Sequence, residues 1–388
     1  MPIKNRLAEM HDEITGWRRH LHTIPELMFD LPQTTAFVED TLREMGITDI
    51  TTGVGQSGIV AVIEGKTNAS GKVIGLRADM DALPITEATG LDYASTHPGK
   101  MHACGHDGHT AMLLGAAKYL SETRNFDGKV VLIFQPAEEG GGGGNEMVKD
   151  GLMERWGIQE VYGMHNSPGD PVGSFHIRPG ALMASADQFD IVLTGKGGHA
   201  ASPHEAIDTN LAAAHVLIAL QSIASRNVDP LKQVVVSVCT FRSETEAYNV
   251  IPQTVLLRGT VRALDPDVRD LAQERLSRIA TLTAEAYGCT ADVEYERGYP
   301  ITVNAEANTD FAADIAEIVA GSVDRETTPI MAGEDFSYML EKRPGAYMFL
   351  GNGSGAHVHH PEYNFNDDAI PAGCSWFAEI VERRMPAA

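Results

Sequence analysis

The amino-acid sequence is poor in positive charge. Its 388 residues include 30 Lys and Arg against 53 Asp and Glu, which gives a formal net charge of −23 at pH 7. This imbalance argues against nucleic acid or an anionic membrane surface as a partner. An anionic substrate would need a local positive patch or a bound cation to attract it.

The sequence also lacks long apolar runs and the apolar core of a signal peptide. Its longest apolar region, 211–223, is too short to span a bilayer and contains His215 and Gln221. Cysteine is scarce, and the four cysteines are widely scattered, which is not the pattern of a disulfide framework. We therefore expect a cytoplasmic protein in a reducing compartment.

Short apolar runs alternate with helical patterns in the first half of the chain. This alternation predicts an α/β fold with a mixed, largely parallel sheet and helices on both faces. Ligands bind at the carboxyl ends of such strands, and there the sequence places Arg77 and Asp79, Glu138 and Glu139, and His165. The expected strands are 58–65, 72–80, 129–136 and 161–165, and the expected helix is 109–122.

A different pattern occupies the middle of the chain. Between 187 and 299 the order of elements is strand, helix, strand, strand, helix, strand, which is the ferredoxin-like β-α-β-β-α-β unit. The buried-strand pattern of the first half resumes at 346–353. We therefore expect a small domain, 187–299, inserted into a larger α/β domain that consists of 1–186 and 300–388.

The stretch "MHACGHDGHT", 101–110, concentrates side chains that bind metals. Cys104 and His106 are two residues apart, so a loop can bring a thiolate and an imidazole to one place, and both suit zinc and similar metals. The same pair could be a thiol nucleophile with its base. The carboxylates and histidines at the strand ends favour the metal. His109 follows at helical spacing, where a helix begins and can turn it inward.

Two adjacent carboxylates, Glu138 and Glu139, follow a buried strand and precede five glycines. On an extended backbone they point in different directions, so one can bind a metal while the other transfers protons. The glycines let the backbone turn close to an ion or substrate. A phosphate loop is excluded because no GK[ST] follows and two glutamates stand where the anion would bind.

Other histidines are ambiguous on their own. His165 ends an apolar run, where a histidine is often part of the core. The C-terminal stretch "GAHVHHPEY" contains His357, His359 and His360, and histidine-rich loops are common.

Together these motifs resemble the M20 family of metallopeptidases and amidohydrolases, in particular its branch of aminoacylases, hippurate hydrolases and indole-acetyl-amino-acid hydrolases. The resemblance covers nearly the whole chain, and several long motifs in one order are highly specific. The motifs are "GLRADMDALPI", "MHACGHDGHTAMLLGAA", "FQPAEEGGGG", "GMHN", "GGHAASPHEAID", "AYNVIPQTVLLRGTVR", "GEDF" and "HHPEYNFND".

The resemblance implies a two-metal site. It assigns five metal ligands, one of them a bridging sulfur. The C-terminal ligand of the family lies two residues before a proline, which selects His359 over His360. The implied ligands are Cys104, which bridges, and His106, Glu139, His165 and His359.

The same resemblance assigns roles around the metals. Glu138 falls on the general base, and Asp79 on an aspartate that steadies a ligand. Relatives outside this branch have a metal-binding histidine where Arg77 stands, so His106 is expected to replace it.

The inserted domain corresponds to the family's lid and dimerisation domain. His199 resembles a histidine that stabilises the oxyanion, often from the partner subunit. Asn249 and Arg262 fall on positions that hold the substrate's carboxylate or scissile carbonyl. We therefore expect a homodimer, or a higher oligomer, that forms through this domain.

The resemblance implies a metal-dependent amidohydrolase. The enzyme would cleave an N-acyl amino acid, hippurate-type or N-acetylated, into a carboxylic acid and an amino acid. It would use two divalent ions, zinc or manganese, with cobalt or nickel as alternatives. A dipeptidase or carboxypeptidase of the family would share every metal residue, and a cysteine-dependent thiol hydrolase is a hypothesis of a different class.

Overall fold

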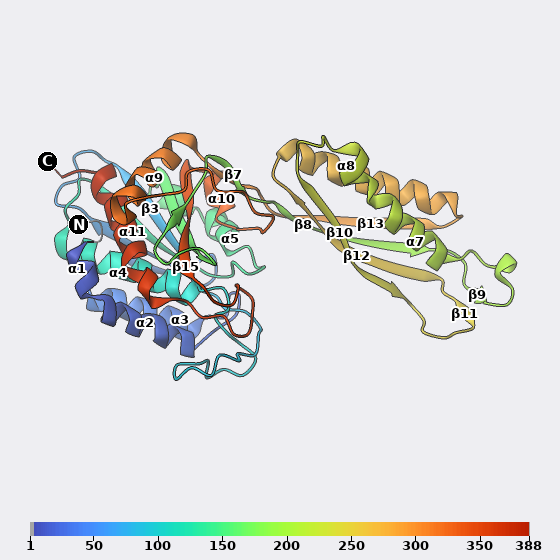
Figure 1. Cartoon of the computed structure of the whole chain (residues 1–388), viewed down its shortest axis with the longest axis horizontal. Coiled ribbons are helices and arrows are strands. Elements are labelled where there is room, and N and C mark those ends of the chain that lie inside the picture. The colour runs from blue at the N-terminus through green and yellow to red at the C-terminus, as the bar shows by residue number, and fades with distance from the viewer. Residues whose placement is uncertain (1–3, 388) are drawn as a thin grey trace. The chain divides into compact units, whose positions relative to one another are not determined.

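The computed structural model describes residues 4–387, and the chain divides into two compact units. Unit 1 contains the chain up to Gly180, the segment Val303–Thr328 and the chain from Asp335 onward. Unit 2 contains Ala181–Thr302 and the short segment Pro329–Glu334. Both ends of the described part of the chain belong to unit 1 (Figure 1).

Among the described residues of unit 1, seven strands form one mixed sheet in the order β1-β2-β4-β3-β5-β15-β6. The central strands β4, β3, β5 and β15 are parallel, and β1, β2 and β6 add antiparallel edges. Parallel strands are usually buried on both faces, and β3 and β15 are buried along their whole length. The strands are β1 (Ile50–Val54), β2 (Gly58–Glu64), β3 (Val73–Asp79), β4 (Lys129–Gln135), β5 (Glu160–Pro168), β6 (Phe175–His176) and β15 (Gly345–Gly353).

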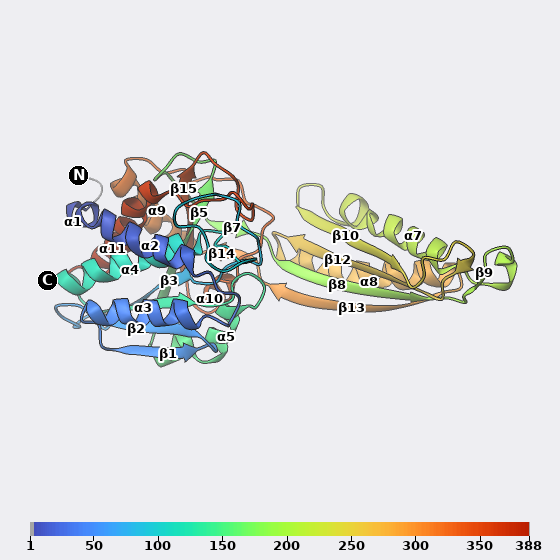
Figure 2. The same ribbon diagram turned by 90° about the horizontal axis from the view of Figure 1, so that it is seen from below.

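Helices cover both faces of this sheet (Figure 2). On one face, Leu76 of β3 and Met348 of β15 belong to a large apolar core that also includes residues of α4, α9 and α11. On the other face, Phe336, next to α10, stacks on Tyr347 of β15 with 5.2 Å between ring centroids. The predicted α/β fold is confirmed. The helices are α1 (Asn5–Glu9), α2 (His11–Thr23), α3 (Pro32–Glu44), α4 (His106–Thr123), α5 (Gly143–Lys149), α6 (Leu152–Arg155), α9 (Glu306–Ala320), α10 (Ser337–Leu340) and α11 (Ile370–Arg384).

The described part of unit 2 contains a four-stranded antiparallel sheet in the order β10-β12-β8-β13, against which α7 and α8 pack. Strand β8 alternates: Phe189, Ile191 and Leu193 are buried, whereas Val192 is 39% exposed. The predicted ferredoxin-like β-α-β-β-α-β order is confirmed. The main elements are β8 (Ala186–Thr194), α7 (Thr209–Leu220), β10 (Val234–Ser243), β12 (Thr254–Ala263), α8 (Pro266–Ala286) and β13 (Thr290–Tyr299).

Local capping chemistry sets the starts of both helices in unit 2. The Asp208 carboxylate accepts the N–H of Leu211 at 3.1 Å at the start of α7. The Asp265 carboxylate accepts the N–H of Val268 at 3.1 Å at the start of α8, where Pro266 occupies the first helical position. Both are favoured helix-start arrangements.

The unit boundaries differ from the expected ones. The chain enters unit 2 after Gly180 rather than after 186, and leaves it after Thr302 rather than after 299. Residues 329–334, expected in the larger domain, also belong to unit 2. The reason is a set of backbone hydrogen bonds between distant segments: the Ala184 N–H donates to the Ile330 and Ala332 carbonyls at 3.1 and 2.9 Å.

Two expectations from composition concern membranes and thiols. Within residues 4–387, every helix is too short or too polar to cross a bilayer. Each cysteine of the chain is a free thiol; these are Cys104, Cys239, Cys289 and Cys374.

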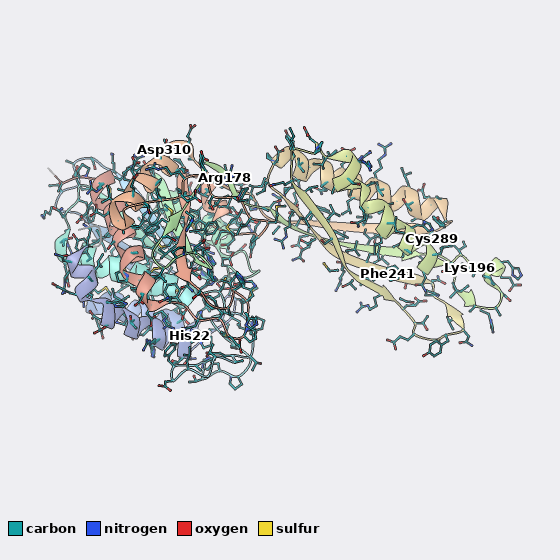
Figure 3. All side chains as sticks on the ribbon, viewed as in Figure 1. His22, Arg178, Lys196, Phe241, Cys289 and Asp310 are labelled. Carbon is teal, nitrogen blue, oxygen red and sulfur yellow. The ribbon has the colours of Figure 1, made fainter. Side chains whose placement is uncertain are left out.

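A buried charge cluster joins α2 to α4 in unit 1. His22, near the end of α2 (Figure 3), lies 2.7 Å through Nδ1 from the Asp107 carboxylate and 3.3 Å through Nε2 from that of Glu87. Burial alone would lower the pKa of His22, but Asp107 and Glu87 outweigh it and raise the pKa from 6.5 to about 9. A shift of this size corresponds to about 3 kcal/mol of stability.

We expect His22→Gln to lower the apparent Tm of the metal-free protein by about 4–6 °C at pH 5.5. The folded pKa is raised, so the stabilisation is complete below pH 6.5 and is lost as the pH rises through about 9. Thermal unfolding of both proteins from pH 5.5 to 9.5 checks this. The exposed His20 of the same helix supplies the control His20→Gln. A Tm difference that does not shrink with rising pH would contradict the assignment.

Candidate metal centre

The carboxyl ends of three strands bring distant residues together in unit 1. Strands β4, β3 and β5 are parallel neighbours, so their ends meet at one edge of the sheet. Strand β3 ends at Asp79, Glu138 and Glu139 follow β4, and His165 lies in the second half of β5. His106 is the first residue of α4.

The donor atoms of the five predicted ligands cluster at this edge. Cys104, His106 and His165 form one group, and Cys104, Glu139 and His359 form another, with the donor atoms of each group within 4.8 Å of one another. Sγ of Cys104 is 3.3 Å from Nε2 of His165, and Oε1 of Glu139 is 3.2 Å from Nε2 of His359. Cys104 belongs to both groups.

Unsatisfied polar atoms indicate that the cluster suits a cation. Both ring nitrogens of His106 are buried and make no hydrogen bond within the described residues, which is costly unless something else binds them. Nδ1 of His165 donates to the Asn166 carbonyl at 2.7 Å, so Nε2 of that ring keeps its lone pair and faces Cys104. These residues therefore fit divalent metal ions.

The electrostatics disfavour a thiol nucleophile. Burial raises the pKa of the Cys104 thiol well above its usual value, and the carboxylates of Glu139 and Glu138 add to the effect. Burial, helped by His109, lowers the pKa of His165 to about 3. An activated thiol needs the opposite, a low thiol pKa beside a protonated histidine. The Cys104–His165 pair is therefore better suited to bind a metal than to attack a substrate.

Carboxylates make the centre strongly negative. Burial alone would lower the pKa of His106, but Asp79, Asp81 and Glu139 outweigh it and raise the pKa to about 10. Burial opposes the ionised form of Glu139, yet His359 and His106 lower its pKa. A divalent ion would have to displace the proton from His106, so metal binding should release protons.

Of two neighbouring histidines, the structure places His359 in the cluster. His359 has a φ of 66°, an unfavourable conformation for a residue other than glycine. Its N–H donates to the Ala103 carbonyl at 2.7 Å, which ties the loop to the segment that carries Cys104. His360 is exposed, and its Nδ1 accepts the N–H of Glu362 at 3.1 Å.

Asp79 lies between a cation and a histidine. Its Oδ2 accepts from Nη1 of Arg77 at 2.8 Å, and its Oδ1 accepts from Nδ1 of His109 at 2.6 Å. Burial opposes the ionised form, but His106, Arg77 and His109 lower the pKa of Asp79 well below its usual value. Nε2 of His109 accepts the Asn166 N–H at 3.0 Å. Both nitrogens of His109 are thus occupied, so this histidine supports the site and is not a ligand.

Asn166, which was not among the predicted site residues, connects several parts of the site. Its Nδ2 donates to the Cys104 carbonyl and its Oδ1 accepts from the Tyr363 hydroxyl, both at 2.6 Å. Its own carbonyl orients His165. The available signal for Asn166 was its position next to His165 in the motif "GMHN". Its contact with Tyr363, 197 positions away, leaves no local pattern in the sequence.

The predicted substrate residues of unit 2 lie in two separate places within one chain. His199 lies on β9 (Gly198–His199) and Asn249 precedes β11 (Val250–Ile251); these two strands pair at one tip of unit 2 (Figures 1 and 2). Arg262 lies near the other end of β12, and the extended chain from Thr254 to Arg262 spans roughly 27 Å. His199 and Arg262 of one chain therefore cannot contact the same small substrate.

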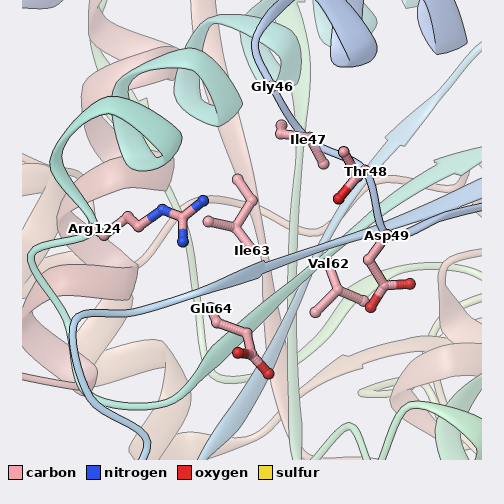
Figure 4. A pocket seen from close by; sticks show the side chains of 8 residues that line it. All are labelled: Gly46, Ile47, Thr48, Asp49, Val62, Ile63, Glu64 and Arg124. Carbon is pink, nitrogen blue, oxygen red and sulfur yellow. The ribbon is translucent and has the colours of Figure 1, made fainter.

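A hollow of about 290 Å³ lies elsewhere on unit 1 (Figure 4). It is lined by residues 46–49, by 62–64 of β2 and by Arg124. Glu64 pairs with Lys129, the first residue of β4, so this hollow lies at the amino ends of the parallel strands. It contains none of the predicted site residues, which gather at the carboxyl ends.

Comparison with known proteins identifies the relatives of this chain. The sequence profile described as peptidase family M20/M25/M40 matches residues 75–383. An N-acetyl-L-cysteine deacetylase of Bacillus subtilis is 41% identical over 98% of this chain and 90% of its own. A hippurate hydrolase of Campylobacter jejuni is 40% identical over 98% and 99%. A thermostable carboxypeptidase of Saccharolobus solfataricus is 42% identical over 90% and 88%.

Solved structures agree with the fold. A protein of Bacillus subtilis, described as a dinuclear metal binding peptidase from the M20 family, superposes with a TM-score of 0.85 at 34% identity. The superposition covers 97% of this chain and 99% of that one.

We expect Cys104→Ser to lose bound metal and hydrolytic activity together. Loss of a group that only supports a ligand costs ~10–100-fold in metal affinity, and loss of a bridging ligand should cost at least as much. Metal content by mass spectrometry and the rate of hydrolysis check this. Cys289→Ser replaces a buried thiol of unit 2 and serves as the control. A Cys104→Ser protein that keeps its metal but is inactive would support the thiol hydrolase instead.

Proposed function

Because the chain belongs to peptidase family M20/M25/M40, we propose that it is a metal-dependent amidohydrolase acting on N-acyl amino acids. It would release a carboxylic acid and a free amino acid. The observation that carries this proposal is the pair of donor groups that have Cys104 in common and together contain five residues, with Glu138 beside them. The named activities of the deacetylase and the hippurate hydrolase support it.

The proposed ligands are the two groups that share Cys104. Bound zinc or manganese ions, with cobalt or nickel as alternatives, would polarise the scissile carbonyl and make water a better nucleophile near neutral pH. The five residues are Cys104, His106, Glu139, His165 and His359.

Glu138 is the proposed general base. Its side chain is buried, 7% exposed, and a carboxylate oxygen of Glu138 lies within 4.8 Å of a donor atom of Glu139 and of one of His106. It would take a proton from the attacking water and deliver it to the amine nitrogen of the leaving amino acid. Asp79 would fix the orientation of His109, which in turn contacts Asn166 beside the proposed ligand His165.

Arg262 is the proposed contact for the substrate carboxylate. Its half-buried guanidinium makes no hydrogen bond or ion pair with any other described residue. Burial lowers its pKa, so an anionic partner would be favourable. Arg262 would supply the local positive charge that the acidic chain otherwise lacks.

The separation of His199 and Arg262 supports a site completed by a second chain. We propose that His199, with Asn249, reaches the substrate bound by the partner subunit and stabilises the oxyanion. Unit 2 offers an apolar surface for a homodimer: Leu211 and Ile218 on α7 are 49% and 64% exposed, and Phe241 on edge strand β10 is 44% exposed.

Carboxypeptidase activity is the second candidate, and the 42% identical archaeal carboxypeptidase supports it. The C-terminal residue of a peptide is itself an N-acylated amino acid, so the metal centre and Arg262 would act in the same way. The two candidates differ in the acyl side of the substrate.

The free thiols of all four cysteines support the proposed cytoplasmic location.

We expect the protein, reconstituted with each metal in turn, to hydrolyse N-acetyl and N-benzoyl amino acids faster than dipeptides. Chelation should abolish the activity and metal addition should restore it, because the substrate carbonyl would be polarised by the ions. Release of free amino acid measures each rate. Faster cleavage of peptides would favour the carboxypeptidase, and indifference to chelators would exclude both.

The Glu138→Gln variant separates chemistry from binding in the same assay. It should bind metal as the wild type does, while kcat falls by ~10²–10⁴-fold, the usual contribution of a general base. Robust turnover by this variant would contradict the role of Glu138.

We expect two inactive variants to complement each other if His199 acts across subunits. In a dimer of Glu138→Gln and His199→Ala chains, one site combines an intact Glu138 with the partner's intact His199. Random mixing of subunits should restore about one quarter of wild-type activity. Activity after mixed refolding, compared with each variant alone, checks this. No recovery in verified heterodimers would place His199 in the site of its own chain or outside the mechanism.

A further inference from the structure

We propose that Asp81 is a positioning residue that holds the Glu138–Glu139 turn and His106 in one fixed arrangement. The roles of these three residues rest on the proposed function, but their contacts with Asp81 do not. Asp81 lies two residues beyond the end of β3 and is 1% exposed.

The Asp81 carboxylate contacts the backbone of both glutamates. Its Oδ1 accepts the N–H of Glu138 at 2.9 Å, and its Oδ2 accepts the N–H of Glu139 at 3.1 Å. One side chain thus binds two successive backbone groups in a turn that must direct the two glutamates differently. Charge-assisted bonds of this kind are stronger than neutral ones.

The same carboxylate faces a proposed metal ligand. Oδ1 of Asp81 lies 3.5 Å from Nδ1 of His106, which is an ion-pair distance without a hydrogen bond, while Nε2 of that ring lies 3.9 Å from Oε1 of Glu139. A carboxylate beside one ring nitrogen of a histidine favours the proton there and leaves the other nitrogen free to bind a metal. Asp81 therefore links the orientation of His106 to the position of Glu139.

The turn held by Asp81 has an unfavourable backbone conformation. Ala137, which precedes the two glutamates, has a φ of 52°, and such strain persists only where surrounding contacts impose it. Without the carboxylate, the N–H groups of Glu138 and Glu139, one buried and one partly buried, would lose their acceptor, which is costly.

The backbone on both sides of Asp81 is fixed. The Met80 N–H donates to the Gln135 carbonyl and the Ala82 N–H donates to the Glu26 carbonyl, each at 2.8 Å. The side chain of Asp81 therefore projects from an anchored segment, which suits a residue that must position others.

The test compares metal affinity in Asp81→Asn with that in a matched control. Asparagine keeps the shape but presents an NH₂ group to one of the two backbone N–H donors. We expect metal affinity to fall by ~10–100-fold and kcat to fall with little change in KM. The thiolate-to-metal absorption of the cobalt-loaded protein should weaken or shift.

Glu26→Gln is the control because the Glu26 carboxylate makes the same kind of contact with the first turn of α3, which carries no proposed metal ligand. The Glu26 carbonyl, which accepts the Ala82 N–H, is unchanged by the substitution. The Glu26 carboxylate is 4% exposed and accepts the N–H groups of Gln33 and Thr34 at 3.0 and 2.9 Å. This variant should lower the apparent Tm while metal affinity and the cobalt spectrum stay at the wild-type values. If Asp81→Asn loses no more metal affinity than Glu26→Gln, the proposal is wrong.

Asp81→Glu keeps two acceptor oxygens on a longer side chain and provides the second comparison. Its metal affinity should lie between those of wild type and Asp81→Asn; an affinity no better than that of a folded Asp81→Asn contradicts the proposal. If Asp81→Asn does not fold, Asp81→Glu decides alone, and unchanged metal affinity overturns the proposal. Affinity and spectra are measured without substrate, so failure to hydrolyse N-acyl amino acids would remove the proposed function and leave this comparison intact.

Discussion

The carboxylate of Asp79, shared between Arg77 and His109, is the interaction on which the rest of the site depends. It joins the end of β3 to the first turn of α4, and the start of α4 determines where His106 lies. A buried carboxylate is costly unless charges and hydrogen bonds surround it. Arg77 supplies the compensating positive charge, and His109, which is held by Asp79, accepts a hydrogen bond from the Asn166 N–H. The sheet, the helix and the donor cluster are therefore held by one set of buried contacts.

Much of the fold could be predicted because its signals are local. Apolar runs separated by a helical pattern indicate strands buried in a parallel sheet, and the alternation in β8 indicates a strand with one open face. The segment 329–334 could not be assigned to unit 2 in the same way, because its backbone bonds with 182–184 leave no periodic trace in either segment.

The residues of the site show the same difference between local sequence signals and contacts with distant backbone groups. Glu138, Glu139 and His165 could be selected because each follows or ends an apolar run, where the carboxyl ends of parallel strands meet. Asp81 and Asn166 were not selected, because most of their contacts are with backbone groups. Any residue can provide a backbone N–H or carbonyl, so such partners are invisible in a sequence. The choice of His359 depended on resemblance, and its placement beside Glu139 agrees with that choice.

The position of β15 between β5 and β6 has a consequence for folding during translation. Strand β15 is the last strand of the chain, so during synthesis the sheet of unit 1 must wait for it while the main segment of unit 2 is already complete. His359 emerges later still, after every other proposed ligand. Since domains fold as units while the ribosome is still adding residues, the nascent chain holds an incomplete donor set throughout most of translation. Acquisition of the full set of proposed metal ions would therefore be a late event in maturation, because the last proposed ligand is synthesised near the end of the chain.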